Sequence, residues 1–265
     1  MTPTKSTSRL AWAGALLGLL IATVLFAPAS WLAGAIAWGT GDKVQLVNTR
    51  GTVWRGQGDL LLTGGEGSRT ASALPQGLRW RLNPTWAERQ PAIALALETP
   101  CCAKQPMRIT VLPGFKTNTV RLAAFSSQWP AVLLAGLGTP WNTLRPEGEL
   151  ALASSGLSVQ MFEGRLRLEG GVQVDALDMT SRLSTLRPLG SYRVQLEATP
   201  EGNSALLRLS TLNGGLQLQG NGQWIGARLR FQGFAQAAPG RETALENLLN
   251  IIGRRDGPRS ILAVG

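Results

Sequence analysis

The stretch GELALASSGLSVQMFEGRLRLEGGVQVDALDMT, residues 148–180, indicates the fold class of the chain. Apolar and polar residues alternate along it, as in Arg165-Leu166-Arg167, which is the pattern of strands with one buried face. Glycine-containing breaks such as Glu169-Gly170-Gly171 are typical of tight turns. Short strands joined by tight turns form an antiparallel meander, so we predict strands at 148–154, 157–163, 164–169 and 171–183.

The same alternation continues on both sides of this stretch. Towards the C-terminus, turn signals such as Gly220-Asn221-Gly222 divide strands that we predict at 191–199, 204–211, 214–220, 222–225, 227–237 and 259–264. Towards the N-terminus, residues 51–65 are predicted as a hairpin that turns near Gly56–Gly58. Further strands are expected there at 44–49, 78–82, 93–97, 107–112 and 119–123.

Helical spacing interrupts the strands twice. The first helix is expected within 127–138, where Pro130 suits a first turn and Gly138 suits a C-terminal stop. The second is expected over 241–253, with acidic residues early and Arg254-Arg255 directly after it.

The first 41 residues predict a membrane segment. Residues 10–41 carry no charge, and about 20 apolar residues suffice to cross a bilayer as a helix. We therefore expect a cytoplasmic tail at 1–9, a transmembrane signal-anchor helix at 10–34 and an exported β-rich domain at 42–265. Lys5 and Arg9 orient the N-terminus towards the cytoplasm by the positive-inside rule.

A cleaved signal peptide is the alternative, because Ala27-Pro28-Ala29 resembles a cleavage site. We favour an uncleaved anchor, since the apolar run exceeds the usual length of a signal-peptide core. Trp31 and Trp38 continue the apolar pattern beyond the site, as interfacial anchors do. The fold class is thus mainly β: an N-terminal transmembrane helix, then a curled antiparallel sheet (meander, half-barrel or sandwich-like), one short internal helix and a C-terminal helix.

The charge of the chain is strongly basic, with a formal net charge of +10. Nucleic-acid binding is not expected, because the longest basic run is the pair Arg254-Arg255. Arginines instead alternate with apolar residues, as in Arg79-Trp80-Arg81 and Arg228-Leu229-Arg230, which places them on a solvent-exposed strand face. A basic surface of this kind also favours an anionic membrane or an acidic partner.

Catalytic chemistry is not expected. The chain has no His, which excludes Ser-His-Asp triads and His-ligated metals, and its carboxylates do not cluster. We therefore predict no enzyme, no cofactor, and no catalytic or metal-binding residues. The two cysteines, Cys101 and Cys102, are adjacent and are candidates for a vicinal disulfide. Free thiols, or a cross-link between two molecules, are the alternatives.

The loop LGTPWNTLRPEGEL, residues 137–150, is the most distinctive short segment. It is predicted as a rigid connector stiffened by two prolines, with a partner-docking loop as the alternative. Trp141 is expected to pin the loop to the core, and Asn142 to bond local backbone.

The chain resembles the type II secretion system protein N family of Gram-negative bacteria. The motifs that carry the resemblance, in order, are GTVWRG (51–56), LPQGLRWRLNP (74–84), LGTPWNTLRPEGEL (137–150), LGSYRV (189–194), LSTLNGGLQLQGNGQW (209–224) and LLNIIGRRDGPRSIL (248–262). Trp141, Asn142 and Arg145 stand in this signature as candidates for a partner contact. The cysteine pair is not part of the pattern.

The resemblance implies a function. It implies a single-pass inner-membrane protein with a periplasmic domain, an accessory component of type II secretion that supports transport of folded exoproteins across the outer membrane. Its partners would be inner-membrane platform components or the outer-membrane secretin. The family brings no catalytic residues. A likeness to periplasmic β-rich proteins of the AsmA type implies the alternative, a lipid-binding or lipid-handling protein with a continuous apolar groove between open strand edges.

Overall fold

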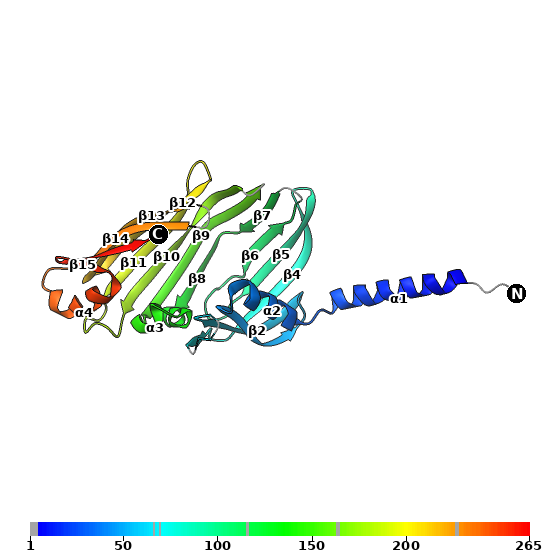
Figure 1. Cartoon of the computed structure of the whole chain (residues 1–265), viewed down its shortest axis with the longest axis horizontal. Helices are drawn as coiled ribbons and strands as arrows, with labels where there is room; N and C mark the ends of the chain where they lie inside the picture. The colour runs from blue at the N-terminus through cyan, green and yellow to red at the C-terminus, as the bar shows by residue number, and fades with distance from the viewer. Residues whose placement is uncertain (1–4, 66, 69, 115–116, 163–164, 226–227) are drawn as a thin grey trace.

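The chain folds into one long antiparallel sheet, with helices gathered at one end of its strands (Figure 1). The computed structural model describes residues 5–265, apart from 66, 69, 115–116, 163–164 and 226–227. The 16-stranded sheet has the hydrogen-bonded order β1-β2-β4-β5-β6-β7-β9-β10-β11-β12-β13-β14-β16-β15, with β3 on β2 and β8 on β9. This order does not return to its start, so the sheet is open. The predicted antiparallel β fold is confirmed, and the described residues form a single sheet rather than a sandwich.

The elements have the following bounds. The strands are β1 Val44–Gly51, β2 Arg55–Thr63, β3 Ala71–Ala73, β4 Leu78–Ala87, β5 Gln90–Glu98, β6 Met107–Leu112, β7 Thr117–Leu122, β8 Phe125–Pro130, β9 Glu147–Phe162, β10 Arg165–Thr180, β11 Gly190–Ala198, β12 Ser204–Gly214, β13 Leu216–Ile225, β14 Arg228–Ala237, β15 Arg254–Asp256 and β16 Arg259–Val264. The helices are α1 Lys5–Leu25, α2 Ala29–Thr40, the 3-10 helix η1 Ala131–Leu137, α3 Trp141–Leu144 and α4 Glu242–Ile252.

The stretch 148–180 forms the hairpin β9–β10, in which four predicted strands become two. Gly171 pairs with Gly156 and Val172 with Ser154, so Ser155 is an extra residue in a β-bulge. A Cβ at Gly170 would lie 1.9 Å from the Gly156 carbonyl oxygen. The predicted turn at Gly170 is therefore wrong, because its glycine allows a close approach inside a bulged strand. The predicted break between 163 and 164 lies outside the described residues.

The predicted turn at Gly220-Asn221-Gly222 is also wrong. Strand β13 runs straight through these residues, and Gly222 pairs with Phe231 of β14. A Cβ at Gly220 would lie 2.3 Å from the Phe231 ring. The glycines make room for an aromatic side chain on the neighbouring strand, so they belong to the packing of the sheet rather than to a turn.

The long strand β9 joins the two halves of the sheet. One edge pairs with β10, while the other pairs with β8 along its first part and with β7 along its last part. The helix predicted over 127–138 is partly wrong, because residues up to Pro130 form β8 and helical structure begins at Ala131. Trp129 pairs with Leu150 there, so the strand ladder prevails over helical spacing. The predicted C-terminal helix is confirmed as α4.

The helix predicted as one span over 10–34 is wrong. It divides into α1 and α2, because Pro28 cannot donate a backbone hydrogen bond and disfavours helix at the residue before it. Helix α2 packs Ala29, Leu32 and Ile36 against the sheet. Within the described part of the chain, no helix combines the length and apolarity needed to cross a membrane. Of the predicted tail 1–9, residues 5–9 belong to α1 and 1–4 lie outside the described residues.

The turn between β1 and β2 holds the junction of α1 and α2. The indole N–H of Trp54 donates to the Val24 carbonyl at 2.7 Å, and the Val53 amide donates to the Ala27 carbonyl at 2.8 Å. The turn lies at 52–54, so the turn predicted near Gly56–Gly58 is wrong. Gly56 lies in β2, where a Cβ would be 2.3 Å from the ring of Trp80.

The core lies on one face of the sheet. Strand register places Trp80 of β4, Tyr192 of β11 and Ala235 of β14 on this face, where α2 covers the first and α4 covers the other two. Leu245 and Leu248 of α4 are 0% and 2% exposed there. On the opposite face, arginines such as Arg79, Arg81, Arg228 and Arg230 are exposed, which confirms the predicted solvated face.

Candidate functional site

The signature loop 137–150 connects η1 to β9 through the short helix α3. Trp141 is 37% exposed, so the prediction that it pins the loop to the core is wrong. Leu144 does so instead, because it packs against the α4 cluster and its carbonyl accepts hydrogen bonds from the Ser181 hydroxyl at 2.7 Å and the Arg182 amide at 3.3 Å. The side-chain oxygen of Asn142 accepts from the Thr143 hydroxyl at 3.3 Å, rather than from backbone as expected.

A pocket of about 390 Å³ lies beside α3 and is called the α3 pocket below. Its walls come from four parts of the chain: the segment entering β3, η1, the signature loop and the loop after β10. The lining residues are Thr70, Ala71, Ser72, Val132, Ala135, Asn142, Arg145, Glu147 and Arg182. Two of the three predicted contact residues, Asn142 and Arg145, therefore share a pocket, whereas Trp141 does not line it.

Sequence reasoning missed Arg182 and the β3 wall of the pocket. Arg182 follows a long strand and has no motif around it, and the three-residue strand β3 is too short to give a periodic signal. Sequence reasoning also did not select Glu147 as a pocket residue, although Glu147 lies in the signature loop beside Asn142 and Arg145.

The α3 pocket carries an excess of positive charge. Arg145 and Arg182 line it together with one carboxylate, Glu147, and no ion pair links these three among the described contacts. Arg145 has the left-handed backbone of a helix C-cap, with φ 42°, and its amide donates to the Trp141 carbonyl. This cap fixes the direction in which the chain leaves α3. The pocket chemistry suits an acidic side chain of a partner protein.

A second feature is a row of apolar side chains on the core face, beyond the reach of the helices. Register places Trp86, Ile93, Val120, Met161 and Trp224 on the same face as Trp80. Their exposures run from 38% for Ile93 to 74% for Trp86. We call these five residues the open apolar face. Exposed apolar surface that spans many strands is typical of a contact with protein or lipid.

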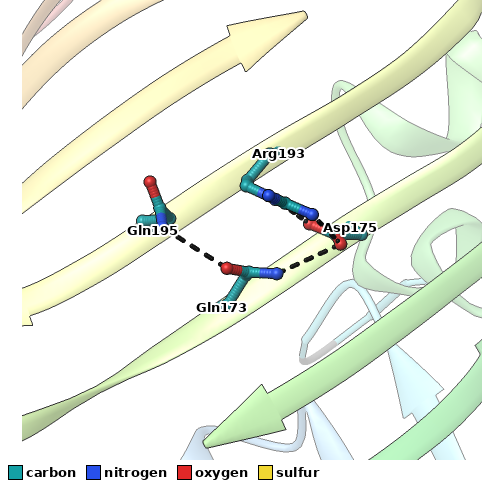
Figure 2. A network of polar contacts seen from close by, with 4 residues as sticks. All are labelled: Gln173, Asp175, Arg193 and Gln195. Atoms are coloured by element: carbon teal, nitrogen blue, oxygen red, sulfur yellow. Dashed lines mark hydrogen bonds and ion pairs between the residues drawn. The ribbon is translucent and has the colours of Figure 1, made fainter. Parts of the chain in front are cut away.

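A polar network on the opposite face ties β10 to β11 (Figure 2). Arg193 donates from Nε and Nη2 to the two carboxylate oxygens of Asp175, both at 2.7 Å. Gln173 donates to Asp175 at 3.1 Å, and Gln195 donates to Gln173 at 3.3 Å. The Arg193 hydrogen bonds hold the pKa of Asp175 below its usual value, although burial opposes the shift. Both carboxylate oxygens of Asp175 accept hydrogen bonds, so this network ties strand β10 to strand β11.

The family model described as type II secretion system (T2SS), protein N matches residues 42–262. This chain belongs to the protein N family. The match covers the open sheet from the residues before β1 into β16, and it includes every wall of the α3 pocket. Comparisons with curated proteins and with solved structures found no match.

Protein N membership confirms the resemblance and implies a component of type II secretion that interacts with other components of that system. Within this domain the signature loop connects η1 to β9 and also forms one wall of the α3 pocket.

The cysteine pair lies apart from the α3 pocket, in the N-terminal half of this protein N domain. The structure joins Cys101 and Cys102 by a disulfide. Cys102 is buried with Leu74 and Leu133, and its carbonyl accepts the Gln128 amide of β8 at 2.6 Å. The pair therefore lies where the β5–β6 connection meets β8 and η1, and it has a place in the packing of this half of the sheet.

Proposed function

We propose that this protein N chain is an accessory inner-membrane component of the type II secretion machinery. It supports the transport of folded exoproteins across the outer membrane through contacts with other secretion components, and it is not an enzyme. The observation that carries the proposal is the family match over residues 42–262, which covers the whole open sheet.

The exposed side chains of α1 support the membrane placement. Trp12, Leu16, Leu20 and Leu25 are all at least 57% exposed, and α1 projects away from the sheet (Figure 1). Apolar side chains on an isolated helix need a covering, and lipid supplies one. In this proposal α1 is embedded in the inner membrane, and the sheet lies on the periplasmic side.

The α3 pocket supports the proposed protein contact. It combines two arginines without an ion pair among the described contacts, exposed Val132 at its rim and exposed Trp141 nearby. Arginine and tryptophan are the residue types that most often dominate binding energy at protein interfaces. We propose that an acidic segment of an inner-membrane platform component or of the secretin docks here.

Deletion and affinity capture test the proposal together. The chain is deleted from a secreting cell, and exoprotein release is measured with and without a tagged copy. The proposal expects reduced release, restoration by the tagged copy, and co-purification of secretion components from detergent-solubilised envelopes. Unchanged release, together with capture of no secretion component, would refute it.

The open apolar face favours a second candidate function, a lipid-binding or lipid-handling protein of the AsmA-like type. The sheet is open, and side chains such as Val120, Met161 and Trp224 on its core face remain 40–45% exposed. Lipid extraction and mass spectrometry of the gently purified chain would test it. Co-purifying acyl lipid that is lost from Val120→Glu, but not from the outer-face variant Arg108→Glu at an exposed position of β6, would support lipid handling. The absence of such lipid would exclude it.

A further inference from the structure

Four arginines gather on the polar face of the sheet beside the β1–β2 turn. Strand register places Arg55 of β2 opposite Arg81 of β4. Gln57 of β2 lies opposite Arg50 of β1 on one side and opposite Arg79 of β4 on the other. All four arginines are exposed, and together they line a hollow of about 350 Å³. We call Arg50, Arg55, Arg79 and Arg81 the arginine cluster.

The charge of the arginine cluster is not balanced by its surroundings. Glu98 is the carboxylate that lines the same hollow, and it forms an ion pair of 3.0 Å with Arg81. The neighbouring carboxylate, Asp59, accepts a hydrogen bond from Asn48 at 2.9 Å. No ion pair of Arg50, Arg55 or Arg79 occurs among the described contacts.

A bound anion would offset the repulsion between the arginines of this cluster. Like charges directly opposite each other on neighbouring strands, as Arg55 and Arg81 are, destabilise a sheet. Guanidinium groups are planar forks that donate two hydrogen bonds to one phosphate, and several of them around one hollow are typical of phosphate recognition. The cluster therefore has the chemistry of a phosphate site.

The arginine cluster lies close to the end of the projecting helix α1, which favours a phosphate at a membrane surface. Arg55 directly follows Trp54, whose indole holds the end of α1 at Val24. The apolar side chains beside this junction are exposed, at 57% for Leu25 and 75% for Phe26. Trp31, in the first turn of α2, is also 57% exposed, and tryptophans are enriched at the interface between lipid and water. The arginine cluster thus lies at the end of the sheet from which α1 leaves.

We propose that the arginine cluster binds the phosphate of an anionic phospholipid headgroup at the periplasmic surface of the inner membrane. The inference rests on the proposed placement of α1 in the bilayer. Juxtamembrane arginines are attracted to anionic lipid, and the hydrogen bonds of Trp54 fix the cluster close to the end of α1. The site differs from the open apolar face, because it lies on the opposite face of the sheet and recognises a headgroup rather than acyl chains. Its consequence is a fixed orientation of the sheet on the membrane.

Native mass spectrometry of the full chain in nonionic detergent tests the site. Micelles are doped with phosphatidylglycerol or, for comparison, with zwitterionic phosphatidylcholine. The test variant is Arg79→Gln/Arg81→Gln on β4, and the matched control is Arg228→Gln/Arg230→Gln on β14, an exposed pair with the same spacing on the same face. We expect phosphatidylglycerol adducts of the wild type and the control, and about tenfold or greater loss in the test variant. Arg55→Gln, with an unchanged thermal midpoint, should also lose adducts.

Several results would overturn the inference. Equal loss in both double variants, or equal binding of the two lipids, would show that no specific headgroup site exists. Displacement of the lipid by millimolar inorganic phosphate would assign the hollow to soluble phosphate, and displacement by polyglutamate would assign it to an acidic protein segment. Alkaline extraction of envelopes separates this test from the membrane proposal. Release of the chain would refute the placement of α1, whereas retention without selective adducts would refute the headgroup site alone.

Discussion

The indole N–H of Trp54 donates to the carbonyl of Val24 at 2.7 Å, and this contact joins the β1–β2 turn to the end of the projecting helix α1. The hydrogen bond spans 30 residues of sequence, and the bond from Val53 to Ala27 lies beside it. Together they make the direction of α1 a property of the sheet rather than of a free linker.

We predict that Trp54→Phe loosens the α1 junction while it leaves the sheet folded. An aromatic ring remains, but the indole N–H donor is lost, at a cost of about 1 kcal/mol. Proteolysis near residues 25–29 should become faster in limited digestion of the detergent-solubilised chain. Trp38→Phe is the control, because Trp38 is 88% exposed on α2. This variant should be digested at the same rate as the wild type. Equal cleavage of all three proteins would contradict the junction.

Helix α4 should be essential for the C-terminal half of the sheet. Leu248 is 2% exposed in the cluster that includes Tyr192 and Ala235. Leu248→Ala should lower the free energy of unfolding by about 2–5 kcal/mol, because it removes buried methyl groups and leaves a cavity. Ile251→Ala on the same helix is the control, since Ile251 is 50% exposed, and it should change stability far less. Denaturant titration measures both, and similar losses would mean that α4 does not pack as described.

Gly170 should not tolerate a side chain. A Cβ there would lie 1.9 Å from the Gly156 carbonyl oxygen, in a backbone with φ 87° that disfavours other residues. Gly170→Ala should therefore destabilise the chain by about 1–3 kcal/mol or more, because β9 and β10 must separate at the bulge. Gly39→Ala in α2 is the control, because a Cβ at Gly39 would meet nothing within 4 Å, and it should be neutral or slightly stabilising. Thermal denaturation of both variants measures the difference.

The Asp175–Arg193 pair should make stability depend on pH. The pKa of Asp175 is lowered in the folded chain, so the pair stabilises the fold above the unfolded pKa of about 3.9. This stabilisation is lost as the pH falls through the lower, folded pKa. Asp175→Asn should thus unfold at lower denaturant than the wild type at pH 7, and the difference should shrink below about pH 4. In an Arg193→Gln background the same substitution should have little effect. A difference that is independent of pH would contradict the pair.

The sequence predicted the elements better than their junctions. Alternation along β9 and β10 was sufficient to predict an antiparallel sheet, and the spacing of Leu245, Leu248 and Leu249 predicted α4. Glycine was misleading at Gly170 and Gly220, because local sequence does not distinguish a turn from a site where another strand approaches. The unbroken apolar run 10–34 likewise did not show that its second part packs on the sheet.

The candidate site was predictable only in part, for the same reason. Asn142 and Arg145 belong to a recognisable motif, but Arg182 joins them through a hydrogen bond to the Leu144 carbonyl that only the folded chain creates. Trp141 was expected in the core because tryptophan is usually buried there. The short helix α3 instead leaves it half exposed, and Leu144 packs in its place.

The central claim is that the α3 pocket contacts another component of type II secretion, and site-specific photo-crosslinking in secreting cells tests it most directly. A photoreactive residue replaces Asn142 in the pocket or, as the control, exposed Arg108 on β6. We predict that the residue at 142 forms a crosslink to a secretion component, that Arg145→Glu/Arg182→Glu abolishes it, and that the residue at 108 forms none. A crosslink at 142 that survives the double charge reversal, or the same products at both positions, would contradict the account.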